Sequence, residues 1–106
     1  MLPISFEFYP PKTDEQRAQL DRSVQRLKAH APQFMSVTFG AGGSTLSHTP
    51  ETVQRLRSEH GVAGVPHLTC VGGSREEIRQ LLKLYRALGC DRVVALRGDT
   101  PSGMVR

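Results

Sequence analysis

A chain of 106 residues can form one domain around one hydrophobic core, and its 38% hydrophobic and 23% charged residues are typical of a folded globular protein rather than a disordered one. It contains no apolar run of the ~20 residues that a membrane span requires, and its N-terminus lacks the charged and apolar regions of a signal peptide. The net charge of +4 comes from basic residues scattered among acids, which favours a mixed solvated surface over a nucleic-acid-binding patch.

The first predicted element is a strand over residues 4–9, in which apolar side chains stand at every second position until two prolines end it. Glu7 places an acid in the middle of this strand. A helix follows, and Thr13 and Gln16 form a possible capping box at its start. Its expected apolar stripe consists of Leu20, Val24, Leu27 and Ala31.

The second strand is predicted over residues 34–39, and a glycine-rich run over residues 40–44 ends it. The second helix is expected to start with Thr49 as its N-cap and Pro50 as its first helical residue. The glycine run has neither the lysine of a P-loop nor the spacing of a dinucleotide fingerprint. It is therefore either a flexible turn or a place where backbone approaches a ligand closely.

A third strand is predicted over residues 65–70, and Ser74 with Glu77 forms a clear capping box for the third helix. The face that this helix is expected to bury consists of Ile78, Leu81, Leu82, Tyr85 and Leu88. A fourth strand over residues 92–96 leads into an Arg-Gly-Asp sequence at residues 97–99.

Strands and helices that alternate in this way predict a parallel sheet with right-handed crossovers. Two α/β architectures fit the pattern. One is a small open doubly wound sheet, and the other is the first half of a (β/α)8 TIM barrel, which typically needs ~250 residues. Length alone favours the open sheet.

Each predicted strand turns polar near its carboxyl end. Since these ends share one edge of a parallel sheet, where α/β folds bind ligands, the polar side chains form a candidate site. Its members are Glu7, Thr38, His67, Thr69, Arg97 and Asp99.

Each member also has a purely structural interpretation. The aromatic residues that flank Glu7 argue against full exposure, and desolvation would favour the protonated carboxyl, the form of a general acid. The structural alternatives for Glu7 are a surface carboxylate on an edge strand and a buried acid paired with an arginine. His67 is either a satisfied core histidine or a ligand contact, and Arg97 with Asp99 is either an internal ion pair or part of a binding site.

The two cysteines, Cys70 and Cys90, lie far apart and show no CxxC or Cys/His ligand spacing. The sequence therefore indicates neither a metal site nor a disulfide framework, and a cytoplasmic protein with two free thiols is expected.

Four segments carry a resemblance to a known family: SFEFYPPKT, SVTFGAGG, HLTC and ALRGD. In this order and spacing they resemble the N-terminal half of the methylenetetrahydrofolate reductases, over residues 4–101. That family is a (β/α)8 barrel that binds FAD. The resemblance implies that residues 1–106 form strands one to four of its catalytic domain, and it outweighs the preference for an open sheet.

The family reduces 5,10-methylenetetrahydrofolate to 5-methyltetrahydrofolate in one-carbon and methionine metabolism, with NADH or NADPH first reducing the flavin. The resemblance implies that Glu7 is the general acid that helps the folate ring open to an iminium ion, which then accepts hydride. It places Thr38 near the nicotinamide and Asp99 beside both flavin and folate. The implied flavin contacts are Phe39, Ala41, His67, Arg97, Gly98 and Asp99.

The chain stops after the fourth predicted strand, whereas the family's barrel has a second half. The resemblance therefore implies a fragment of a longer, homo-oligomeric protein. The alternative is a non-catalytic half-barrel that acts as an assembly module, because the first and fourth strands would present unpaired edges. The sequence does not distinguish NADH from NADPH.

Overall fold

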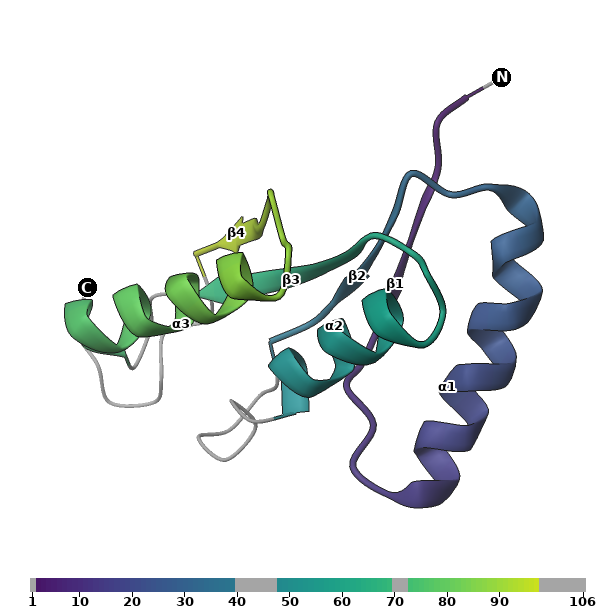
Figure 1. Ribbon diagram of the computed structural model, residues 1–106, viewed down its shortest axis with the longest axis horizontal. Helices are drawn as coiled ribbons and strands as arrows, with labels where there is room; N and C mark the ends of the chain where they lie inside the picture. The colour runs from purple at the N-terminus through teal and green to yellow at the C-terminus, as the bar shows by residue number, and fades with distance from the viewer. Residues whose placement is uncertain (1, 40–47, 70–72, 98–106) are drawn as a thin grey trace.

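The computed structural model of the chain describes residues 2–39, 48–69 and 73–97 (Figure 1). Strands and helices alternate along these segments, as the sequence predicts. In chain order the elements are β1 (Ser5–Phe8), α1 (Asp14–Leu27), the short 3-10 helix η1 (Lys28–His30), β2 (Phe34–Val37), α2 (His48–Ser58), β3 (Gly64–Thr69), α3 (Arg75–Ala87) and β4 (Val94–Leu96).

The four strands form one parallel sheet in the order β1-β2-β3-β4. Consecutive strands that lie side by side, joined by the right-handed crossovers that parallel strands adopt, place every helix on the same face of the sheet. A doubly wound sheet instead reverses its strand order and carries helices on both faces. The strand order is thus that of the first half of a (β/α)8 barrel, and the open sheet that length alone favours is wrong.

One hydrophobic core fills the space between the sheet and its helices. All three α-helices contribute to it, which confirms that they cover the same face (Figure 1). Phe6 and Phe8 of β1 pack against this core, so their alternation directs Glu7 to the opposite face. The buried members of the core are Leu20, Val24, Met35, Val37, Val53, Leu56 and Tyr85.

Helix α1 begins at the predicted cap. The Thr13 hydroxyl accepts a hydrogen bond from the Gln16 N–H at 3.1 Å, but the Gln16 side chain accepts from the Lys12 N–H at 2.8 Å, so the capping box is only half formed. Ala31 does not extend the apolar stripe: it is exposed and adopts a φ of 51° just after η1. Pro32 explains this difference, because a proline disfavours the helical conformation in the residue before it.

Helix α2 already includes His48, so the prediction that Thr49 is its N-cap is wrong. Thr49 is fully buried, and its hydroxyl donates to the Thr38 carbonyl at 2.9 Å, which ties the helix to the end of β2. Pro50 lies in the first turn, where a missing N–H leaves no intrahelical bond unmade.

Helix α3 starts with the predicted capping box, in which the Ser74 hydroxyl and the Glu77 carboxylate each accept from the other residue's N–H. Of its expected buried face, only Tyr85 is fully buried, and Leu82 is 41% exposed. Leu81 packs against the core, whereas Leu82, about 100° further around the helix, does not. None of the helices in the described segments has the length and apolar character needed to cross a bilayer.

Candidate functional site

Three neighbouring strands bring polar side chains together on the face opposite the helices. Glu7 of β1 pairs in register with Ser36 of β2, which in turn pairs with Val65 of β3. His67 follows Val65 by two positions and so points to the same face. Its Nε2 atom lies 3.2 Å from the Glu7 Oε1 and 3.1 Å from the Ser36 Oγ. The expected convergence of Glu7 and His67 is therefore a direct contact.

The members of this Glu7–Ser36–His67 cluster differ in their access to solvent. The His67 side chain is 6% exposed and Ser36 is buried, whereas the Glu7 side chain is 60% exposed. The expectation that aromatic neighbours shield Glu7 is wrong, because Phe6 and Phe8 pack into the core on the other side of the sheet. The cluster thus presents an accessible carboxylate in contact with a buried imidazole, which in turn contacts a buried serine hydroxyl.

Thr38 and Phe39 follow directly after β2. The Thr38 N–H donates to the Phe8 carbonyl at 2.9 Å, which continues the pairing of the two strands to this edge. The Thr38 Oγ1 and the His67 Nδ1 are buried and have no hydrogen-bond partner among the described residues. The carboxyl-end edge of the sheet therefore carries two buried polar atoms that make no hydrogen bond to the described residues.

Arg97 follows directly after β4 and is exposed. The Thr69 hydroxyl at the end of β3 donates to the Arg97 carbonyl at 3.4 Å, which holds the two strand ends together. The remaining predicted site residues, Ala41, Gly98 and Asp99, lie outside the described segments.

A hollow of about 700 Å³ lies between α1, the segment that connects it to β1, and the residues that follow β2. Thr38 and Phe39 of the predicted site line it, whereas Glu7 and His67 do not. Within the described residues, the Glu7–Ser36–His67 cluster therefore lies on an open sheet face and not in an enclosed pocket.

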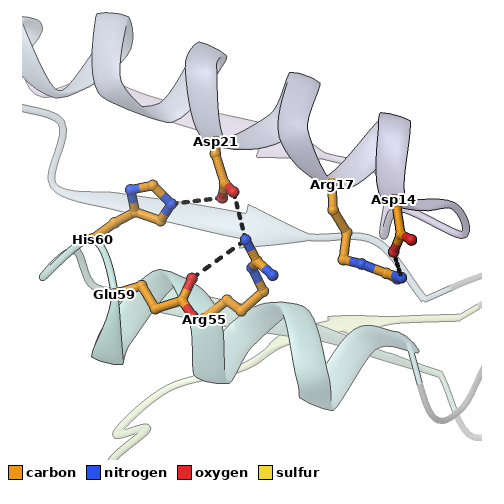
Figure 2. A network of polar contacts seen from close by, with 6 residues as sticks. All are labelled: Asp14, Arg17, Asp21, Arg55, Glu59 and His60. Carbon is orange, nitrogen blue, oxygen red and sulfur yellow. Dashed lines mark hydrogen bonds and ion pairs between the residues drawn. The ribbon is translucent and has the colours of Figure 1, made fainter.

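A second polar cluster joins α1 to α2 on the helix side of the sheet (Figure 2). The Asp21 carboxylate of α1 accepts from the Arg55 guanidinium and lies 2.8 Å from the His60 Nε2, and Arg55 also lies 3.3 Å from Glu59. Asp21, Glu59 and His60 lie close enough to share a cation. However, Arg55 already supplies positive charge among them. We therefore interpret these four residues as an ion-pair network that holds α1 against α2, called the clamp below.

Comparison with known proteins identifies the family. The family model described as methylenetetrahydrofolate reductase matches residues 2–105. The chain belongs to the methylenetetrahydrofolate reductase family. Over 100 residues it is 39% identical to the 5,10-methylenetetrahydrofolate reductase of Salmonella typhimurium and 38% identical to that of Escherichia coli. Over the same length it is 41% identical to methylenetetrahydrofolate reductase (NADH) 1 of Zea mays.

These matches cover 94% of the chain but only 34% of each of the two bacterial reductases and 17% of the plant one. The chain thus spans about a third of the bacterial relatives. Together with the strand order, family membership confirms the first half of a TIM barrel as its architecture. In such a barrel the face without helices becomes the interior, and the active site lies at the carboxyl ends of the strands.

Ser36 was not included among the members of this cluster in the sequence analysis. A serine in a strand carries little information alone. The signal that could have identified it is its alternation with two apolar residues, Met35 and Val37, which places it on the same face as Thr38.

Proposed function

We propose that the protein that carries this chain is a flavoenzyme that reduces 5,10-methylenetetrahydrofolate to 5-methyltetrahydrofolate with hydride from NADH or NADPH. The observation that supports this proposal best is the 3.2 Å contact between Glu7 and His67 on the open sheet face of a member of this family. Two groups that can carry protons lie together, and one of them, the Glu7 carboxylate, is exposed to a ligand.

Glu7 is the proton donor in this proposal. Its side chain is 60% exposed, so a substrate nitrogen can approach the carboxyl directly, and His67 restrains the orientation of the carboxyl from the buried side. Transfer of the Glu7 proton to the bridging ring of the folate makes the C–N bond easier to break, because the departing nitrogen leaves neutral. A positioned general acid typically contributes a rate factor of about 10² to 10⁴.

FAD is the proposed cofactor, and the residues at this edge fit it. The guanidinium of Arg97 is exposed and suits the phosphates of a dinucleotide, and the unused polar atoms of Thr38 and His67 suit the polar edge of a flat ring system. Phe39, Ala41, Gly98 and Asp99 complete the proposed flavin contacts, with Thr38 beside the nicotinamide and Asp99 also beside the folate. When bound, the flavin supplies the hydride, and the chain supplies the proton, orients the reactants and provides the electrostatic environment.

The test is a spectroscopic titration of the protein expressed from the complete reading frame that encodes this chain. We expect FAD to bind, its absorbance to bleach when NADH or NADPH is added without oxygen, and 5,10-methylenetetrahydrofolate to restore it. A flavin that is bleached by the nicotinamide but never restored by the folate would contradict the proposed substrate. Failure to bind FAD would contradict the proposed cofactor.

The same titration on the 106-residue chain tests the alternative, a non-catalytic half-barrel that serves as an assembly module. This alternative has one supporting observation: at the edge of the sheet, Leu96 of β4 is 44% exposed. An isolated chain that binds FAD and turns over folate, at whatever oligomeric mass, would exclude it.

A further inference from the structure

The His67 Nε2 faces two oxygen atoms at nearly equal distance, the Glu7 Oε1 at 3.2 Å and the Ser36 Oγ at 3.1 Å. A ring nitrogen carries at most one proton and can donate one strong hydrogen bond at a time. The two oxygens are therefore competing acceptors for a single N–H group.

The surroundings of the ring indicate which nitrogen carries that proton. The Nδ1 atom is buried and has no partner among the described residues, so a proton there would be a buried donor without an acceptor. The Nε2 atom has two acceptors at hand. The Nε2–H tautomer is thus the one that leaves no ring N–H group without an acceptor in this part of the chain.

The preferred acceptor depends on the state of Glu7. An ionised carboxylate accepts the stronger, charge-assisted bond, so Nε2–H points to Glu7 when Glu7 has lost its proton. A protonated carboxyl is a weaker acceptor, and it must turn its own O–H toward the substrate to act as an acid. At that moment the Nε2–H group needs the other oxygen.

We propose that Ser36 is a positioning residue whose hydroxyl oxygen accepts the His67 Nε2–H bond whenever Glu7 carries its proton. The catalytic part of this inference rests on the proposed function of Glu7. A serine hydroxyl can accept this bond where an alanine cannot, and because Ser36 is 5% exposed, water cannot easily take its place. The exchange of acceptors moves no proton between residues, so the only proton transferred is the one that passes from Glu7 to the substrate.

The hydrogen bond itself is tested by NMR of the protein labelled with ¹⁵N-histidine, in which the His67 signals are assigned by their loss in His67→Gln. We expect the His67 Nε2–H proton to be visible in the wild type, in Ser36→Ala and in Glu7→Ala, because each retains one acceptor. It should disappear in the double variant. Loss of the signal in Glu7→Ala alone would overturn the proposal, since Ser36 would then not act as the second acceptor.

The functional consequence is tested by timing the two half-reactions separately in the flavin-loaded protein. Ser36→Ala should slow reoxidation of the reduced flavin by the folate roughly tenfold, the effect of one net hydrogen bond, because Nε2–H then favours ionised Glu7. Reduction of the flavin by the nicotinamide should be unchanged. Ser36→Thr, which keeps the hydroxyl, should restore the rate.

Ser58→Ala is the matched control, since Ser58 is an exposed serine whose hydroxyl donates to the Gln54 carbonyl within α2. Equal slowing of both half-reactions by Ser36→Ala, or no rescue by Ser36→Thr, would contradict a positioning role. A wild-type protein that does not reduce the folate would refute the proposed function, while the NMR measurement would still decide whether Ser36 shares the His67 bond.

Discussion

The imidazole of His67 contacts the carboxylate of Glu7 across an intervening strand, with 3.2 Å between Nε2 and Oε1. The two residues lie on β3 and β1, and Ser36 of β2 lies between them in the register of the sheet. A shift of one residue in either pairing would turn one of these side chains to the helix side. The site therefore depends on how firmly β1, β2 and β3 are held in register.

The first prediction concerns Gly64, which starts the strand that carries His67. A Cβ atom at this position would lie 3.0 Å from the Val53 carbonyl oxygen and 3.1 Å from the Leu56 Cβ, both of which belong to the rigid helix α2. We expect Gly64→Ala to lower the free energy of unfolding by about 1–3 kcal/mol, the usual cost of overpacking, as measured by urea denaturation.

Gly73→Ala is the control for this substitution. Its added Cβ would meet the end of the Ile78 side chain at 3.3 Å, and that side chain can move. Similar stability losses in the two variants would show that the tight packing of α2 on β3 is not what Gly64 provides.

The second prediction concerns the clamp between α1 and α2 (Figure 2). Asp21→Asn keeps the shape of the side chain but removes the charge that faces Arg55 and His60. Because the clamp is partly buried and its hydrogen bonds are charge-assisted, we expect a loss of about 1–3 kcal/mol in the free energy of unfolding.

The control for the clamp is Asp14→Asn on the same helix. Among the described residues, Asp14 pairs only with Arg17, within α1, and its side chain is 96% exposed. Exposed pairs within one helix contribute little, so unfolding of this variant should follow the wild type closely. An Asp21→Asn variant as stable as Asp14→Asn would contradict the role of the clamp.

The third prediction concerns Tyr85, whose side chain is 1% exposed and whose hydroxyl has no partner among the described residues. Burial raises the pKa of Tyr85 above its ordinary value of 10.0, and the nearby Cys90 adds to this effect. The folded state therefore holds the phenol proton more tightly than the unfolded state does. This contribution to stability is complete below pH 10.0 and decreases as the pH rises above that value.

We expect Tyr85→Phe to be as stable as the wild type or slightly more stable at pH 7, because it removes a buried hydroxyl without a partner. Between pH 10 and 11 the variant should lose stability less steeply, by up to about 1.4 kcal/mol per pH unit. Thermal unfolding at a series of pH values measures both effects. Parallel pH dependences in the two proteins would contradict the inferred burial of the phenol.

Burial raises the pKa of the Cys90 thiol as well, although Arg57 opposes it. The wild type and Tyr85→Phe should therefore share a decrease in the free energy of unfolding that begins near pH 9.0.

Much of the fold could be predicted because hydrophobic periodicity reports local structure. The order of strands and helices and the caps at Thr13 and Ser74 depend on neighbouring residues in the chain. The errors occur where contacts distant in sequence decide the outcome. Thr49 donates a hydrogen bond to the backbone at the end of β2 instead of capping its helix. Leu82 remains exposed, while its neighbour Leu81 packs against the core.

The candidate site could likewise be predicted only in part. Glu7 and His67 could be placed at one edge because parallel strands align their carboxyl ends. Their contact and the part played by Ser36 depend on strand register, which periodicity alone does not give. The exposure of Glu7 could have been inferred from its alternation with Phe6 and Phe8, but the aromatic neighbours suggested burial instead.

In the proposed reaction Glu7 donates a proton to the folate, and the direct test of this role is Glu7→Gln in the FAD-loaded protein. Stopped-flow absorbance times reduction of the flavin by NADH or NADPH separately from its reoxidation by 5,10-methylenetetrahydrofolate, with Glu15→Gln, an exposed acid in the first turn of α1, as the control. We predict that Glu7→Gln slows reoxidation by about 10² to 10⁴ and leaves reduction unchanged. Reoxidation at the wild-type rate, or equal loss of both half-reactions with FAD still bound, would contradict the assignment.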